Sequence, residues 1–497
     1  MTKGLNELAR EQVALRKEQA FIRKQLGVED EEVDSASDAA LSIHEEYISS
    51  ADELDEESDK MHSKCPARTI SVMSSDGGYM SSDEDKQPQY KSTKSVSFVV
   101  DLNDSTVQEN DIEKYIKSLP LDLQKLLEGI SQGIPNDYTV PIDKKPDWLD
   151  MKKMKVGQMF AQKFYFGLNY SEMLSLLILF AFPDGLQPLI FTGNSGTPFT
   201  AFRRYLSTVM RVKSWFEHDV FDEKSLAYKN MKTVRAMHLN VSKRLNSVPY
   251  DKLKTQLTVT GPSNDTAVWS NVKNKVQEDF QSGCPVMNFR PIDHERVGKV
   301  FVNQLDMSIT QFGFVGLMIM HPEKFGAGNA TEEELEGFVH LWRGLGYLLG
   351  IEDRFNFCNG TLDEIRRRCH YLVDNWVKPS FQHVTEDWEH MSRCMVEGVS
   401  YYVPGVSFEV SLLYLCWVLD IPAPRLYASL SWGQTIMFNI MKMTMCFTLR
   451  IPGMLTFHNW LIRRSLHRAS SWTPDHLEKL QSKTYSYQKK ESLNTRL

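Results

Sequence analysis

Two groups of side chains in this 497-residue chain have types and spacing that could do chemistry. The first centres on His238, which belongs to a stripe with helical spacing. The members of this stripe are Met231, Val234, His238, Val241 and Leu245. The spacing turns the imidazole toward the protein interior. A buried neutral imidazole needs a partner for each ring nitrogen, so His238 is either a core histidine bonded to a backbone carbonyl or a metal ligand.

The second group lies upstream, on a helix expected to begin at Pro198. Arg204 and Thr208 are four residues apart and Ser207 is three from Arg204, so the three share a helix face. An arginine with two hydroxyls can polarise a bound oxygen species or hold an anion. The alternative is an arginine that extends to the surface and a threonine that bonds to its own helix.

Two downstream segments could complete a pocket. Gly344 and Gly346 lie inside an expected helix at 331–350, where each costs about 1 kcal/mol relative to alanine. Such glycines indicate close packing against a neighbouring helix or a flat cofactor. The segment 303–320 is apolar almost all round, so Gln304 and Gln311 inside it need partners, either structural or in a ligand pocket.

The elements that position these residues are expected to be helices. Apolar residues recur at steps of three and four from about residue 110 nearly to the end, and no strand–helix alternation interrupts them. Thr197 before Pro198 predicts a helix start, and Thr331 with Glu334 predicts a capping box. We therefore predict an all-α fold with a single large helical domain over 95–472.

The ends of the chain have a different character. Residues 1–27 predict a charged helix, and 28–94 are acidic and serine-rich with few large apolar residues. The second segment cannot bury enough surface to offset its ordering entropy and is expected to be a disordered arm. Residues 473–497 are expected to form a polar tail.

Composition excludes several classes of function. The net charge is −7 and no basic stripe with interleaved aromatic residues occurs, which argues against nucleic-acid binding. Seven scattered cysteines without a C-x-x-C pair argue against structural zinc and disulfides. The first residues lack the apolar core of a signal peptide, and no apolar run of about 18 residues predicts a spanning helix.

These features predict a cytoplasmic protein. One part of the chain suits peripheral membrane contact: a methionine- and phenylalanine-rich stretch at 424–449, followed by a basic stretch at 458–468. A solvated basic face is the alternative reading.

Several of these segments together resemble one family. Between residues 145 and 351 the chain is similar to the catalytic domain of latex-clearing proteins, which are bacterial rubber oxygenases, and of the fungal ER-bound oxygenase of mycophenolic acid biosynthesis. The similar segments are Pro146-Asp-Trp-Leu-Asp-Met, Gly157-Gln-Met-Phe, Arg204-Tyr-Leu-Ser-Thr, Val234-Arg-Ala-Met-His, Asp306-Met-Ser-Ile-Thr-Gln and Trp342-Arg-Gly-Leu-Gly-Tyr.

The resemblance implies a globin-like helical core that holds haem b, with His238 as the proximal iron ligand. It also implies that Arg204 and Thr208 line the haem pocket and that O2 is used to cleave a carbon–carbon double bond of an isoprenoid. Two positions depart from the pattern. Ser207 stands where latex-clearing members tend to have lysine. Those members also have a glutamate in the segment before the arginine, where the only nearby carboxylate of this chain is Asp184.

Two hypotheses follow from the sequence. The first is a haem b-dependent oxygenase that uses O2 on an apolar isoprenoid or lipid-like substrate, with Arg204, Ser207 and Thr208 as catalytic residues and His238 on the iron. The second is a non-catalytic haem-binding or helical interaction protein whose acidic arm recruits partners. Arg204 and Thr208 favour the first hypothesis, and the missing glutamate favours the second.

Overall fold

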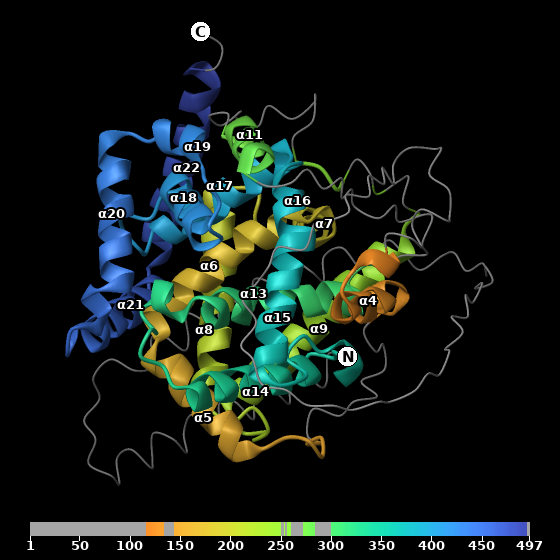
Figure 1. The fold of residues 1–497 in the computed structure, drawn as a ribbon. Coiled ribbons are helices and arrows are strands. Elements are labelled where there is room, and N and C mark those ends of the chain that lie inside the picture. The colour runs from red at the N-terminus through yellow and green to blue at the C-terminus, as the bar shows by residue number, and fades with distance from the viewer. Residues whose placement is uncertain are drawn as a thin grey trace. The chain divides into compact units, whose positions relative to one another are not determined.

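The computed structural model describes residues 116–133, 144–249, 253, 256–259, 272–283 and 300–494 (Figure 1). The all-α prediction is confirmed over these ranges, which contain helices and a single antiparallel bridge between Gly133 and Asn303 but no β-strand. The charged helix predicted at 1–27 and the arm predicted at 28–94 lie outside the described residues.

The first group of helices carries the candidate site. It comprises α4 (Leu121–Leu127), η1 (Glu128–Ser131), α5 (Met151–Lys163), α6 (Tyr165–Ala181), α7 (Pro183–Phe191), α8 (Pro198–Glu217) and α9 (Leu226–Ser247). The next group comprises α11 (Lys273–Gly283), α13 (Gln304–Met320), η2 (Pro322–Phe325), α14 (Glu332–Leu348), η3 (Asp353–Phe355), α15 (Leu362–Leu372), the π-helical turn η4 (Val373–Val377) and α16 (Lys378–Phe381).

The last group comprises α17 (Glu386–Ser400), α18 (Phe408–Val418), α19 (Pro424–Ala428), α20 (Trp432–Cys446), η5 (Thr448–Arg450), α21 (Met454–Ser470) and α22 (Pro474–Asn494). Two expectations differ here. The helical pattern of the methionine- and phenylalanine-rich stretch at 424–449 is not continuous, because Ser431 and Gln434 form a capping box that starts α20 after α19 has ended. The stretch expected as a polar tail contains α22.

Side-chain caps fix where the central helices begin. Thr197 accepts a hydrogen bond from the Thr200 amide at the start of α8, and Thr331 accepts one from the Glu334 amide at the start of α14. Both starts are as the sequence predicts. Each cap satisfies a backbone N–H that the helix itself leaves unpaired.

Glycines allow a close contact between two core helices. A Cβ atom on Gly157 of α5 would lie 2.2 Å from the carbonyl oxygen of Gly337 in α14, so the two backbones touch. Further along α14, a Cβ on Gly346 would lie 2.5 Å from Nε2 of Gln311. The side chain packed against this glycine therefore belongs to α13. Of the two neighbours expected for Gly346, a helix or a flat cofactor, the structure shows the helix.

The buried glutamines of α13 are structural. Gln311 donates to the carbonyl of Trp342 at 2.5 Å and accepts from the amide of Phe357 at 2.9 Å. Gln304 donates to the carbonyl of Gly350 at 3.0 Å and accepts from the amide of Glu352 at 3.0 Å. Each amide group pairs its oxygen and its nitrogen, and together they join α13 to both ends of the segment 342–357.

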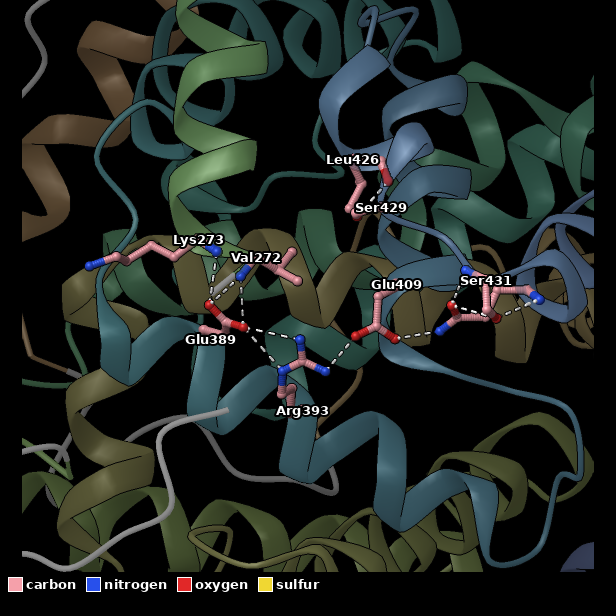
Figure 2. Close-up of polar contacts among 9 residues, drawn as sticks. Val272, Lys273, Glu389, Arg393, Glu409, Leu426, Ser429 and Ser431 are labelled. Carbon is pink, nitrogen blue, oxygen red and sulfur yellow. Dashed lines mark hydrogen bonds and ion pairs between the residues drawn. The ribbon is translucent and has the colours of Figure 1, made fainter. Parts of the chain in front are cut away.

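A buried ion network ties four helices together (Figure 2). Glu389 of α17 accepts from the amides of Val272 and Lys273 at the start of α11. Arg393, whose side chain is 5% exposed, donates to Glu389 at 3.1 Å and to Glu409 of α18 at 2.6 Å. The other oxygen of Glu409 accepts from Nε2 of Gln434 in α20 at 3.0 Å. The network holds the start of α20 against the body.

Among the described residues, no single helix is long and apolar enough to cross a membrane. Helices α5 and α6 reach the length and apolar character of a membrane span only when taken together, and the chain bends by 89° at the break between them.

Candidate functional site

Helices α8 and α9 pack against each other and carry all four side chains singled out in the sequence. The buried face of α9 differs from the predicted stripe. Its buried residues are Ala227, Met231, Arg235, Leu239, Ser242 and Leu245. His238 lies at the margin of this face and is partly exposed. The buried face of α9 is therefore rotated about the helix axis relative to the predicted apolar stripe.

Arg235 explains why the two faces differ. It is 2% exposed and donates a hydrogen bond to the carbonyl of Leu348 at the end of α14. A sequence pattern assigns an arginine to the surface, because the acceptor that allows its burial comes from a residue more than a hundred positions away. The tertiary contact decides the orientation of α9 here.

Of the four candidate side chains, His238 is the one with a buried atom that lacks a hydrogen-bond partner. Its Nδ1 is buried and has no hydrogen-bond partner. Burial, together with the positive charge of Arg204, lowers the pKa of His238 from its usual range to about 4. The imidazole is therefore neutral at physiological pH, and a ring nitrogen is left for a ligand. The carbonyl partner expected of an ordinary core histidine is missing at this nitrogen.

Arg204 links α8 to the turn that precedes it. Its Nη1 donates to Oγ1 of Thr192 at 3.1 Å and to Oγ of Ser195 at 3.2 Å. Ser195 is fully buried. The guanidinium is therefore held against this turn, and its charge acts on His238.

The two hydroxyls are engaged within α8. Thr208 is exposed, and its Oγ1 donates to the carbonyl of Arg204 at 3.1 Å. Ser207 is partly buried, and its Oγ accepts from the guanidinium of Arg211. Neither has a hydrogen bond to His238 within the described structure. The structure thus brings Arg204 and His238 together, whereas Ser207 and Thr208 bond to their own helix.

An apolar cavity of about 180 Å³ lies elsewhere in the helical body. Its walls come from α4, η1, α6, α7, α13 and η4, and its lining includes Leu176, Leu179, Leu189, Ile309 and Trp376. Its acidic lining residues are Asp184 and Asp306. No lining residue belongs to α8 or α9. Helix α7 lines the cavity and then leads into the turn whose Thr192 accepts a hydrogen bond from Arg204, so the cavity and Arg204 are connected along the chain.

A buried carboxyl on α6 was missed in the sequence. Oε1 of Glu172 is buried and has no hydrogen-bond partner, and burial raises the pKa of this carboxyl to about 8. Glu172 is one helical turn before Leu176 in the cavity wall. The sequence could have predicted its burial, because Glu172 is the single charged residue inside the apolar run Leu168–Phe180.

The residues present fit a haem-type axial ligand in one respect. An iron-binding imidazole must be neutral and must have a ring nitrogen without another partner, and His238 satisfies both conditions. Among the described residues, no cluster of three or more His, Cys, Asp or Glu side chains could hold a bare metal ion.

Comparisons with known proteins give one match. The structure of the latex clearing protein LCP in its closed state aligns with a TM-score of 0.44 and 15% sequence identity, over 70% of this chain and 79% of that one. No family model matches the sequence. No curated protein matches it either.

Proposed function

We propose that His238 is the axial ligand of haem b and that the protein is a haem-dependent oxygenase acting on an apolar isoprenoid or lipid-like substrate. One observation carries the proposal: the buried Nδ1 of His238 lacks a partner while the ring is kept neutral. The order and spacing of the family-like segments support the identity of the group. An unpaired buried imidazole nitrogen otherwise costs free energy, on the order of 1–3 kcal/mol.

Haem, when bound, supplies the oxygen chemistry that side chains cannot perform. The chain's own residues have simpler roles. His238 binds through a ring nitrogen that stays unprotonated down to about pH 4. Arg204 lowers the proton affinity of that ring and offers a cation to a carboxylate. The cavity walls contributed by α6, α7 and α13 are apolar, so they exclude water and can accept an apolar ligand.

The direct test is haem reconstitution of the full chain followed by its visible spectrum. We expect a Soret band in the wild type and at least a tenfold loss of haem affinity in His238→Ala. The matched control is His218→Ala, at the exposed end of α8, which should bind haem as the wild type does. No Soret band in the wild type, or equal affinity in both variants, would contradict the proposal.

The second candidate is a non-catalytic haem-binding or helical interaction protein. It is favoured by the exposure of Thr208 and by the contact of Ser207 with Arg211, because neither hydroxyl is directed at the histidine. Oxygen consumption with farnesyl-type lipids separates the two. A haem-loaded chain that consumes no oxygen above a protein-free haem control supports the second candidate.

A further inference from the structure

Exposed apolar side chains gather on one part of the molecule. Of thirteen large hydrophobic residues that are exposed in the described structure, ten lie between residues 427 and 461. These ten are Tyr427, Trp432, Ile436, Ile440, Met443, Phe447, Ile451, Phe457, Trp460 and Leu461. Single exposed apolar residues are ordinary, but a concentration of this size within one segment points to an interaction site. We call this group the α20–α21 face.

Helix α20 is apolar on two opposite sides. Phe438 and Met445 are buried and face the body, where α20 packs against α18 and η2. The exposed residues Trp432, Ile436, Ile440, Met443 and Phe447 recur at steps of three and four, which places them together on the other side. A helix that is apolar all round needs an apolar environment on both sides. Here the body supplies only one.

Helix α21 continues the face with a different composition. Phe457, Trp460 and Leu461 are exposed in its first half, and the exposed Arg464 follows on the same side one turn later. The guanidinium of Arg464 lies 5.7 Å from the ring centroid of Trp460. Tryptophan beside arginine on an apolar face is typical of helices that lie at a lipid interface.

The charge around the face is of one sign. No aspartate or glutamate occurs from residue 421 to 474. The same stretch contains six basic residues, namely Arg425, Lys442, Arg450, Arg463, Arg464 and Arg468. Two of them pair with acids elsewhere, Arg425 with Asp279 and Arg463 with Glu217. The rest of the chain is acidic overall, so this concentration of positive charge is local and suits an anionic surface.

The face is held in place before anything binds. Gln434 in the first turn of α20 donates to Glu409, which Arg393 joins to Glu389 in the buried network (Figure 2). Figure 1 shows α20 at the left edge of the helical body, with α21 starting at its lower end. A preformed face loses little conformational entropy on binding.

We infer that the α20–α21 face binds the surface of an anionic phospholipid membrane, with the helices lying in the interface. The apolar side chains enter the acyl boundary, and the basic residues meet the lipid phosphates. A second copy of this chain suits the face less well, because two such faces would bring like charges together.

Co-sedimentation of the full chain with vesicles tests the inference. We expect binding to phosphatidylcholine vesicles containing 30% phosphatidylserine, and much weaker binding to phosphatidylcholine alone or at about 1 M salt. The double variant Trp432→Ser/Phe447→Ser should bind at least tenfold less tightly. Arg464→Glu should lose about fivefold or more, because one basic residue near an anionic surface contributes on the order of 1 kcal/mol, a fivefold change.

The matched control changes exposed apolar residues outside the face. Leu121 is 71% exposed and Met159 is 61% exposed, similar to Trp432 at 82% and Phe447 at 61%. Leu121→Ser/Met159→Ser should bind vesicles as the wild type does. Equal loss in both double variants would contradict the inference, as would absence of wild-type binding. A wild-type dimer in solution that Trp432→Ser/Phe447→Ser converts to a monomer would assign the face to a second copy instead.

Discussion

Two kinds of buried polar side chain lie in neighbouring helices of this protein. Gln311 and Gln304 of α13 have partners for both the oxygen and the nitrogen of the amide. His238 of α9 and Glu172 of α6 each have a buried polar atom with no hydrogen-bond partner. A satisfied buried amide is explained by the fold alone. An unsatisfied buried group requires a further explanation, and a missing ligand is the one we propose for His238.

The largest effect on stability is expected from removing the satisfied amide of Gln311. Gln311→Leu leaves the amide of Phe357 buried without its partner and removes one of two hydrogen bonds at the carbonyl of Trp342, which lies inside α14. The unpaired amide costs about 1–3 kcal/mol and the lost hydrogen bond about 1 kcal/mol, so we expect the free energy of unfolding to fall by about 3 kcal/mol. Urea denaturation followed by circular dichroism measures this. A fall below about 1 kcal/mol would show that these bonds do not hold α13 in place.

An intermediate effect is expected at Glu172, and it depends on pH. The pKa of its carboxyl is about 8 in the folded protein, above the ordinary value of 4.5, so the folded state holds the proton more tightly. Stability is therefore full below about pH 4.5 and is lost as the pH rises through 8. Between pH 6 and 8 the wild type should lose about 2 kcal/mol more than Glu172→Gln, which cannot ionise.

Thermal or urea unfolding at several pH values, on both proteins, checks this prediction. Parallel curves for wild type and Glu172→Gln would mean that the carboxyl is ionised and paired in the folded state.

The smallest effect on stability is expected at His238. Because its ring nitrogen has no partner, His238→Leu in the haem-free protein should not lower the free energy of unfolding by more than about 1 kcal/mol at pH 7.5. The pKa of about 4 lies below the unfolded value of about 6.5, so the unfolded state takes up the proton first. Wild-type stability should therefore fall between pH 6.5 and 4, and His238→Leu should lack this part of the fall.

A loss of 2 kcal/mol or more at pH 7.5 would instead indicate a satisfied core histidine. Urea unfolding of the haem-free proteins distinguishes the two outcomes.

Local features of the sequence predicted local features of the fold well. The caps at Thr197 and Thr331 depend on residues near one another in sequence, and Gly346 is singled out by the local cost of a glycine inside a helix. They can be predicted because the physical cause is short-range.

What could not be predicted depends on distant partners. Arg235 is buried because α14 offers the carbonyl of Leu348, and this contact rotates the packed face of α9 away from the expected stripe. Arg204 was predicted as part of the site, but its bonds to Thr192 and Ser195 require the turn before α8 to fold back on it. The burial of Glu172 likewise arises from helices that surround α6 rather than from its own neighbours.

The central claim is that a buried nitrogen of His238 is left for a ligand. Replacement of this side chain by glycine, with imidazole added back, tests the claim most directly. We expect haem-reconstituted His238→Gly to lose the Soret band of the wild type and to regain it at millimolar imidazole. A wild-type spectrum in His238→Gly without imidazole would contradict the account, as would a lost band that imidazole does not restore.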